Sequence, residues 1–325
     1  MVFILLIIGL SLLLVGGTAL VRGASGIAGQ YGISPLIVGL TVVAFGTSAP
    51  ELVVNVIGAL RNQTDIAFGN VVGSNLANMG LVLCVAALIK PMVMHGQIVR
   101  RELPLLLLGT SVLLVMTLDH FLIGSLSVIS RSDALILLLL FGVFIYISLG
   151  DVMVRSQDPF LENINELRGM IPAPLVKGLN AHWIYVGTGI TCLSLGGHLT
   201  ITKGAELAHV MGLPPVVVGM LIVAIGTSLP ELVTSIIAAL KDESDLCVGN
   251  VIGSNIFNSL FVLPISALIR PLPVPAGGEI DILLTLAFSA ALLLVFFFDG
   301  ATMNRRTAFA ILVTYISYVS IRALT

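Results

Sequence analysis

The chain is 325 residues long, and 57% of its residues are apolar whereas only 10% are charged, against roughly 25% in an ordinary soluble domain. This composition excludes a soluble globular protein and a disordered one, because so much apolar surface must lie in lipid. The formal net charge of −2 leaves no basic face for a polyanion, so nucleic acid is excluded as a partner. The three cysteines lie in apolar stretches, at spacings that match neither a metal site nor a disulfide framework.

Apolar runs of about 20 residues recur along the whole chain, and each is long enough to cross a bilayer as a helix. Their length and their lack of alternating polar residues favour helices over the strands of a membrane barrel. The first run lacks a charged leading segment, so we interpret it as a span and not as a cleaved signal peptide. The sequence predicts an all-α membrane protein with ten transmembrane helices, at residues 2–22, 34–60, 66–89, 102–118, 132–149, 182–202, 214–240, 246–269, 280–298 and 304–321.

The chain contains an internal duplication. Residues 35–91 align with residues 215–271 at a constant offset of 180, and 29 of these 57 positions are identical. A long polar interval separates the copies, so we expect a first five-helix repeat over 1–150, a linker over 151–180 and a second five-helix repeat over 181–325. Because five is an odd number of spans, the second repeat is inverted in the membrane. Inverted repeats suit alternating access at a site near the membrane midplane.

The distribution of lysine and arginine predicts how the chain lies in the membrane. If the N-terminus is outside, ten of the 15 Lys and Arg residues fall on the cytoplasmic side and five on the other side. Cytoplasmic loops carry an excess of these residues. We therefore expect both termini outside the cytoplasm and the central linker inside it.

An acidic motif lies inside an apolar span in each repeat. Residues 44–51 read AFGTSAPE and residues 224–231 read AIGTSLPE. An ionised side chain at this depth costs several kcal/mol unless it is partnered, which makes the final glutamates, Glu51 and Glu231, functional candidates. Proline cannot donate to the carbonyl four residues back, so we expect the helix to break over 46–50, and its copy likewise. A tightly packed proline kink is the purely structural alternative.

A second polar segment follows in each repeat, reading GNVVGSNLAN at 69–78 and GNVIGSNIFN at 249–258. In each segment an asparagine, a serine and another asparagine are spaced by four residues and share one helix face. The better ligand candidates are Ser74, Asn78, Ser254 and Asn258. Hydrogen bonding between packed helices is the alternative role for the other asparagines, Asn70, Asn75, Asn250 and Asn255.

All of these candidate groups are oxygen donors. Hard cations such as Ca²⁺ and Na⁺ prefer such ligands, whereas zinc or copper would need His or Cys. No His, Lys or Arg occurs at 23–60, 62–89, 210–240 or 242–269, which argues against an anionic substrate. An intramembrane phosphatase would need positive charge to hold phosphate, so we expect a transporter and not an enzyme.

The paired segments resemble the α-repeats of the calcium/cation antiporter superfamily, and in particular those of prokaryotic sodium/calcium exchangers. The resemblance implies that ions bind midway across the membrane, between the second, third, seventh and eighth spans. It implies no cofactor and no protein partner: the chain would meet only the lipid bilayer of a prokaryotic inner (plasma) membrane and its transported ions, Ca²⁺ and Na⁺ (or H⁺). The ligands that it implies are Glu51, Glu231, Thr47, Thr227, Ser48, Ser228, the carbonyls of Ala44 and Ala224, and Ser74, Asn78, Ser254 and Asn258.

Two facing carboxylates repel each other when the site is empty, so moving them bare through a dehydrated closed state is prohibitive. We therefore expect exchange, with Ca²⁺ exported against an inward Na⁺ gradient. Many sodium/calcium exchangers have an aspartate at one of the positions held here by Asn78 and Asn258, so H⁺/Ca²⁺ exchange is the alternative. A passive cation channel with the same oxygen-lined centre is the alternative from another class.

Overall fold

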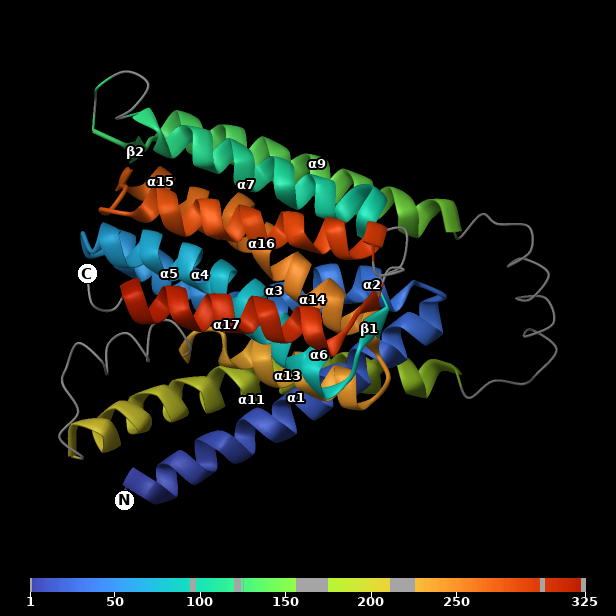
Figure 1. The fold of residues 1–325 in the computed structure, drawn as a ribbon. Coiled ribbons are helices and arrows are strands. Elements are labelled where there is room, and N and C mark those ends of the chain that lie inside the picture. Colours follow the sequence, from blue (N-terminus) through green and yellow to red (C-terminus); the bar gives the residue numbers. More distant parts are fainter. Residues whose placement is uncertain are drawn as a thin grey trace.

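The computed structural model describes residues 2–93, 98–119, 124, 126–155, 175–210, 226–298 and 302–322, and Figure 1 shows their arrangement. Long helices run roughly along one axis of the molecule. This architecture keeps backbone hydrogen bonds inside each segment, as lipid requires. The helices and strands of the first half are α1 (Val2–Tyr31), α2 (Pro35–Val38), the π-helical turn η1 (Gly39–Val43), α3 (Ala44–Thr47), α4 (Ala49–Leu60), α5 (Thr64–Ala77), η2 (Asn78–Val82), α6 (Leu83–Ile89), β1 (Met92–Val93), η3 (Ile98–Glu102), α7 (Leu103–Thr117), β2 (Val128–Ile129) and α9 (Arg131–Arg155).

The second half repeats much of this order. Its elements are α11 (Leu175–Val210), α13 (Leu229–Leu240), α14 (Ser244–Phe257), η4 (Asn258–Val262), α15 (Leu263–Ile269), β3 (Leu272–Pro273), α16 (Gly278–Phe298), β4 (Thr302–Met303) and α17 (Arg305–Arg322). The run from α4 through α5, η2 and α6 to β1 recurs 180 residues later, with the same lengths, as α13, α14, η4, α15 and β3. The two similar stretches of sequence therefore fold in the same way.

Six helical segments of the described chain are long and apolar enough to cross a membrane. A seventh is added if Pro35–Thr47 and Ala49–Leu60, which meet at a bend of 44°, form one span. Helices α7 and α13 are shorter than a full span, and α17 carries three arginines at its ends. The chain is therefore a helical membrane protein, and the larger total of ten spans stays a prediction.

Helices α1 and α11 lie side by side along the lower edge of the molecule in Figure 1. Glycines allow their backbones to approach closely: a Cβ atom on Gly16 would lie 2.8 Å from the Leu193 nitrogen, and one on Gly189 would lie 2.7 Å from the Leu20 nitrogen. Any larger residue at these positions would push the two helices apart. Close packing through small residues is typical of helix pairs in lipid.

Short antiparallel strand pairs connect the two halves of the chain. Strand β1 pairs with β4, and β2 pairs with β3. Figure 1 shows β1 at one end of the helix bundle and β2, with its partner β3, at the opposite end. Since β1 and β3 hold equivalent positions in the duplicated sequence, equivalent parts of the two halves lie at opposite ends of the molecule.

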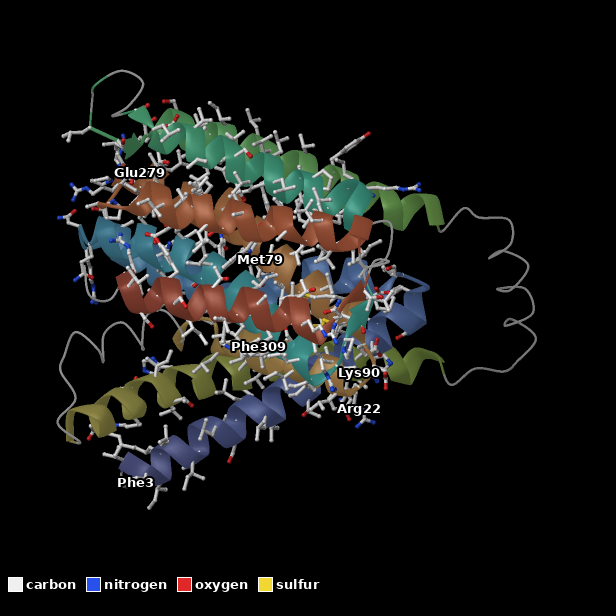
Figure 2. The ribbon with its side chains drawn as sticks, in the orientation of Figure 1. Phe3, Arg22, Met79, Lys90, Glu279 and Phe309 are labelled. Atoms are coloured by element: carbon white, nitrogen blue, oxygen red, sulfur yellow. The ribbon has the colours of Figure 1, made fainter. Side chains whose placement is uncertain are left out.

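Apolar side chains cover the outside of the bundle, and charged ones gather at its ends (Figure 2). Phe3 and Phe309 are 64% and 60% exposed on outer helices, as expected of residues that face lipid. Arg22 and Lys90 lie together at one end of the bundle and Glu279 lies at the other. Polar residues are concentrated inside instead, where α5 and α14 pass through the middle of the molecule.

Candidate cation-binding site

The helix break in the first repeat is confined to Ser48. Its backbone has φ −87° and ψ 4°, between α3, which ends at Thr47, and α4, which begins at Ala49. The sequence predicted a break over 46–50, which is wider than the observed one. Pro50 lies in the first turn of α4, where its missing N–H costs no hydrogen bond, so the helix resumes at once. The same geometry recurs at Ser228, with φ −86° and ψ 6°.

The carboxyl groups of Glu51 and Glu231 meet inside the protein. Each glutamate lies in the first turn of its helix, α4 or α13, where the positive end of the helix dipole favours a negative charge. Both side chains are 0% exposed, and they lie close enough for their charges to repel. Three of their four oxygens, both from Glu51 and Oε2 from Glu231, have no hydrogen-bond partner among the described residues. These buried oxygens need positive charge or donors.

Hydroxyl groups surround the two carboxyls unequally. Ser48 donates a hydrogen bond of 2.9 Å to Oε1 of Glu231, across the boundary between the repeats. The hydroxyls of Thr47 and Ser254 lie beside the same carboxyl group. The equivalent of Ser48 in the second repeat, Ser228, is buried, and its hydroxyl has no partner in the described part of the chain.

The threonines beside these serines are held by the other repeat. The Thr47 hydroxyl donates to Oδ1 of Asn250 at 3.1 Å and lies 3.5 Å from the Ser254 hydroxyl. At the equivalent positions with the repeats exchanged, the hydroxyls of Thr227 and Ser74 lie 3.0 Å apart. Each broken helix therefore lies against the polar helix of the opposite repeat.

The asparagines at the start of the two π-helical turns, Asn78 and Asn258, are both fully buried. Asn78 donates to Oδ1 of Asn255 at 3.0 Å, while its own Oδ1 has no partner among the described residues. Neither the oxygen nor the nitrogen of the Asn258 amide has a partner within that part of the chain. A buried amide with unpartnered polar atoms suits a ligand better than a packing residue.

The other asparagines of the polar helices make hydrogen bonds within the protein. Asn70 donates to Asn55 at 2.7 Å, and Asn250 donates to Ser235 at 3.0 Å in the equivalent position. Asn75 donates to Ser259 at 2.7 Å. These partners, Asn55, Ser235 and Ser259, were not predicted from the sequence. The signal for the first two was available, because each lies one helical turn after Glu51 or Glu231 and so shares its face.

The carbonyl of Ala44 lies one turn before the helix break and already accepts hydrogen bonds. It accepts the Ser48 backbone N–H at 3.0 Å and the Thr47 hydroxyl at 3.3 Å. Ala224, its predicted counterpart, lies outside the described residues. The structure thus brings Ser48, Thr47 and Ser254 to the Glu231 carboxyl and pairs Thr227 with Ser74. The buried groups of both repeats are oxygen donors from carboxylates, hydroxyls and amides.

Buried oxygen donors between two broken helices, inside a membrane bundle, define a class of protein: a membrane transporter for hard cations. Comparison with known proteins agrees. The sequence profile of the family described as "Sodium/calcium exchanger protein" matches residues 1–150 and 181–324. The chain belongs to this family of cation antiporters.

Curated relatives span nearly the whole chain. The inner membrane protein YrbG of Escherichia coli is 38% identical, covering 85% of this chain and 81% of its own. The putative antiporter CaxA of Alkalimonas amylolytica is 35% identical, with 97% and 96% covered. The sodium/calcium exchanger MaX1 of Methanosarcina acetivorans is 30% identical, with 98% and 97% covered.

Among solved structures, the chain resembles the sodium-calcium exchanger NCX_Mj. The form soaked with 10 mM Na⁺ and no Ca²⁺ matches with a TM-score of 0.83 at 25% identity, covering 98% of this chain and 99% of that one. The form soaked with 2.5 mM Na⁺ and 0.1 mM Ca²⁺ matches with a TM-score of 0.80 at 26% identity, covering 97% and 96%. The two proteins share one fold over their whole length.

Proposed function

We propose that this chain exchanges Ca²⁺ for Na⁺ across the membrane, by alternating access at a site built around Glu51 and Glu231. The observation that carries this proposal is that two fully buried carboxyls lie close enough for their charges to interact, with three of their four oxygens unpartnered among the described residues. Such a pair is stable only with protons or cations bound. The sodium/calcium exchangers among its relatives support Ca²⁺ and Na⁺ as the transported pair.

The proposed ligands are those of the sequence prediction. The glutamate carboxylates form the centre, and the hydroxyls and amides around them complete the six to eight oxygens that Ca²⁺ prefers. Two buried groups have no hydrogen-bond partner for any side-chain polar atom among the described residues, which supports their assignment: Ser228 and Asn258. The complete proposed set is Glu51, Glu231, Thr47, Thr227, Ser48, Ser228, Ser74, Asn78, Ser254 and Asn258, with the carbonyls of Ala44 and Ala224.

Exchange follows from the charge of the site. A bare pair of carboxylates cannot pass through a closed, dehydrated state, because each ion loses several kcal/mol of hydration there and the two charges repel. One Ca²⁺ or two Na⁺ would neutralise the pair. The site therefore crosses only when it is loaded, and an inward Na⁺ gradient drives Ca²⁺ out of the cell.

We also propose ten transmembrane helices in two inverted repeats, 1–150 and 181–325, joined by a linker over 151–180. Three observations support this plan. The family profile matches the chain in two ranges, 1–150 and 181–324. The helix boundaries from α4 to β1 recur after 180 residues. The equivalent strands β1 and β3 lie at opposite ends of the bundle, as an inversion requires (Figure 1).

The membrane is proposed to be a prokaryotic inner membrane, with both termini outside the cytoplasm. The relative from Escherichia coli, named as an inner membrane protein, supports the location. Arg22 and Lys90 lie at the end of the bundle where α9 ends and α11 begins, while α1 begins and α17 ends at the opposite end (Figures 1 and 2). Because positive residues favour the cytoplasmic side, the termini belong outside.

Purified protein reconstituted into sealed vesicles tests this function. Vesicles loaded with Na⁺ should take up Ca²⁺ from outside, and replacing the internal Na⁺ with an impermeant cation should stop the uptake at any imposed pH gradient. Uptake driven by the pH gradient without Na⁺ would support the alternative, H⁺/Ca²⁺ exchange, which the paired asparagines Asn78 and Asn258 favour by leaving two acidic groups for protons. Uptake independent of any internal cation would contradict exchange and indicate a channel.

A further inference from the structure

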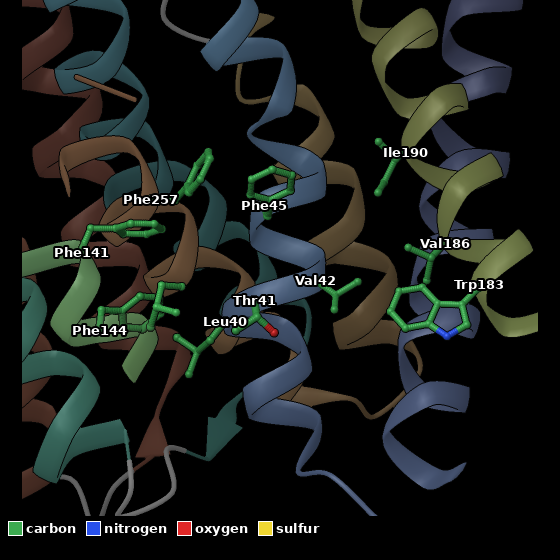
Figure 3. Close-up of a pocket in the computed structure, with 11 residues that line it drawn as sticks. Leu40, Thr41, Val42, Phe45, Phe141, Phe144, Trp183, Val186, Ile190 and Phe257 are labelled. Atoms are coloured by element: carbon green, nitrogen blue, oxygen red, sulfur yellow. The ribbon is translucent and has the colours of Figure 1, made fainter. Parts of the chain in front are cut away.

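A groove opens between the first broken helix, α9 and α11, away from the buried carboxyls. It consists of two adjoining cavities of about 400 and 470 Å³, which share Thr41, Val42, Ile145 and Trp183 as lining residues. The inner cavity ends at Phe45 and Phe257, and the outer one reaches the C-terminal end of α1. Figure 3 shows the inner cavity between the three helices, with α14 behind it.

The inner cavity offers a ligand only apolar surface. Aromatic rings from three helices form its far end, where Phe45 meets Phe257 edge to face at 4.9 Å between ring centres and Phe141 lies 6.0 Å from Phe257 (Figure 3). Thr41 is the polar residue of the lining, and its hydroxyl already donates to the Ile37 carbonyl at 2.6 Å. A hydrocarbon chain matches such a cavity, whereas a polar ligand would lose its hydration without replacement.

The outer cavity is also almost wholly apolar, but residues typical of the membrane surface line it. Tyr31 ends α1, Ser148 ends the candidate span 131–148, and Trp183 lies near the start of the candidate span 181–204. Tyrosine and tryptophan are enriched at the level of lipid headgroups. These residues place the outer cavity at the level of the lipid headgroups.

The groove is continuous with the surface that faces lipid. On α9, Leu139 and Tyr146 are 72% and 79% exposed, and on α11, Ile184 is 61% exposed. From Trp183 to Ile190, α11 rises about 10 Å, which is roughly a third of the hydrocarbon thickness. The groove thus runs from the headgroup level inward within one leaflet, which is the path of an acyl chain.

We propose that this groove binds one acyl chain of a bilayer phospholipid, with its ester group beside Trp183 and its methyl end against Phe45 and Phe257. The inner end adjoins the broken helix, because Gly46 packs so closely on Ile190 that a Cβ atom there would lie 2.5 Å from the isoleucine side chain. A chain in the groove therefore supports the segment that carries Thr47 and Ser48. The proposal does not depend on which ions are exchanged.

Trp183 is the only tryptophan in the chain, so its fluorescence reports directly on the groove. The test uses full-length protein in detergent, titrated with a phospholipid that is brominated next to the carbonyl of one acyl chain, which the proposal places beside Trp183. Bromine quenches tryptophan at contact, and we expect quenching to saturate at one lipid per chain. Quenching that rises in proportion to the lipid content of the micelles, without saturation, would overturn the proposal.

Two substitutions on α9 separate the groove from the general lipid surface. Ile145→Phe fills the groove where its two cavities join, and should weaken lipid binding about tenfold, which is the loss expected when about two methylene groups lose their contacts. Val143→Phe adds the same ring on the 47% exposed, lipid-facing side and should change nothing. Equal quenching curves for the two variants would place the lipid outside the groove and overturn the proposal.

Discussion

Glu51→Gln provides a sharp test of the proposed site, because it removes one charge while keeping the shape of the side chain. Neither oxygen of Glu51 has a hydrogen-bond partner in the described chain, so the substitution breaks no internal bond. Its expected effect is therefore on the ion and not on the fold. We expect the variant to insert and fold normally, and to lose Ca²⁺-dependent exchange.

The size of the effect follows from Coulomb's law. Two unit charges 4 Å apart interact by about 4 kcal/mol at an effective dielectric constant of 20. Ca²⁺ carries two charges, so its interaction with the lost carboxylate is stronger than this value. The amide oxygen of glutamine can still coordinate Ca²⁺ and recovers part of the difference, so we take about 4 kcal/mol as a lower bound for the loss of binding free energy. This corresponds to Ca²⁺ binding that is at least about a thousandfold weaker.

Thermal unfolding of the purified protein measures this loss. At a Ca²⁺ concentration a hundred times its Kd, binding stabilises the native protein by about 2.7 kcal/mol, whereas a thousandfold weaker site gains almost nothing at that concentration. Without Ca²⁺, Glu51→Gln should have a higher Tm than the wild-type protein, because the substitution relieves the repulsion between Glu51 and Glu231. A matched control is Glu206→Gln, on the exposed face of α11, where Glu206 pairs with Lys203 at 2.7 Å.

If Glu51→Gln keeps both a normal Ca²⁺-dependent rise in Tm and normal exchange, the Glu51 carboxylate is not a Ca²⁺ ligand. A lower Tm without Ca²⁺ would also contradict the proposed site, since that result means that the carboxylate stabilises the empty protein.

Three other predictions follow from the asymmetry, charge and packing of the site. Ser48→Ala removes a hydrogen bond to a charged group, worth about 1.5–3 kcal/mol, and should weaken Ca²⁺ binding at least about tenfold in the thermal assay. Ser228→Ala removes a proposed ligand but no hydrogen bond among the described residues, so it should weaken Ca²⁺ binding without lowering the Tm of the Ca²⁺-free protein. With two carboxylates, one Ca²⁺ balances two Na⁺, so exchange in vesicles should not respond to an imposed membrane potential, and Asn258→Asp should make it responsive. Gly189→Ala, whose Cβ atom would lie 2.7 Å from the Leu20 nitrogen, should slow exchange strongly, while Gly187→Ala, with open space around it, should not.

The break in the second span shows how far sequence reasoning reaches. Glycine and proline at 46–50 correctly indicated a break, because proline removes a donor and clashes with the preceding turn. The extent of the break depended on where the new helix began. Pro50 falls in the first turn of α4, which tolerates proline, so only Ser48 leaves the helical conformation. A motif alone does not say in which turn its proline will lie.

The asparagines show a second limit. Helical spacing placed Asn70, Ser74 and Asn78 on one face, but it did not say which of them would find partners. Asn70 and Asn78 each donate a hydrogen bond, to Asn55 and Asn255, and each keeps an oxygen without a partner among the described residues. In the second repeat, Asn250 donates to Ser235, whereas neither polar atom of Asn258 has such a partner. The difference depends on which side chains other helices bring to that face, and such contacts come from residues distant in sequence.

The sequence by itself determined that the chain is a helical membrane protein, that it is internally duplicated and that Glu51 and Glu231 are its exceptional residues. The duplication is read directly from the repeated residues. The other two conclusions follow from free-energy costs within single segments, because an unpaired backbone or an unpartnered carboxylate cannot stay in lipid. Only the tertiary structure decided that Ser48 supports Glu231 from the opposite repeat and that Ser228 has no such partner in the described chain. The two repeats are nearly identical in these motifs, so their different hydrogen bonds arise from how the helices pack, which local sequence does not encode.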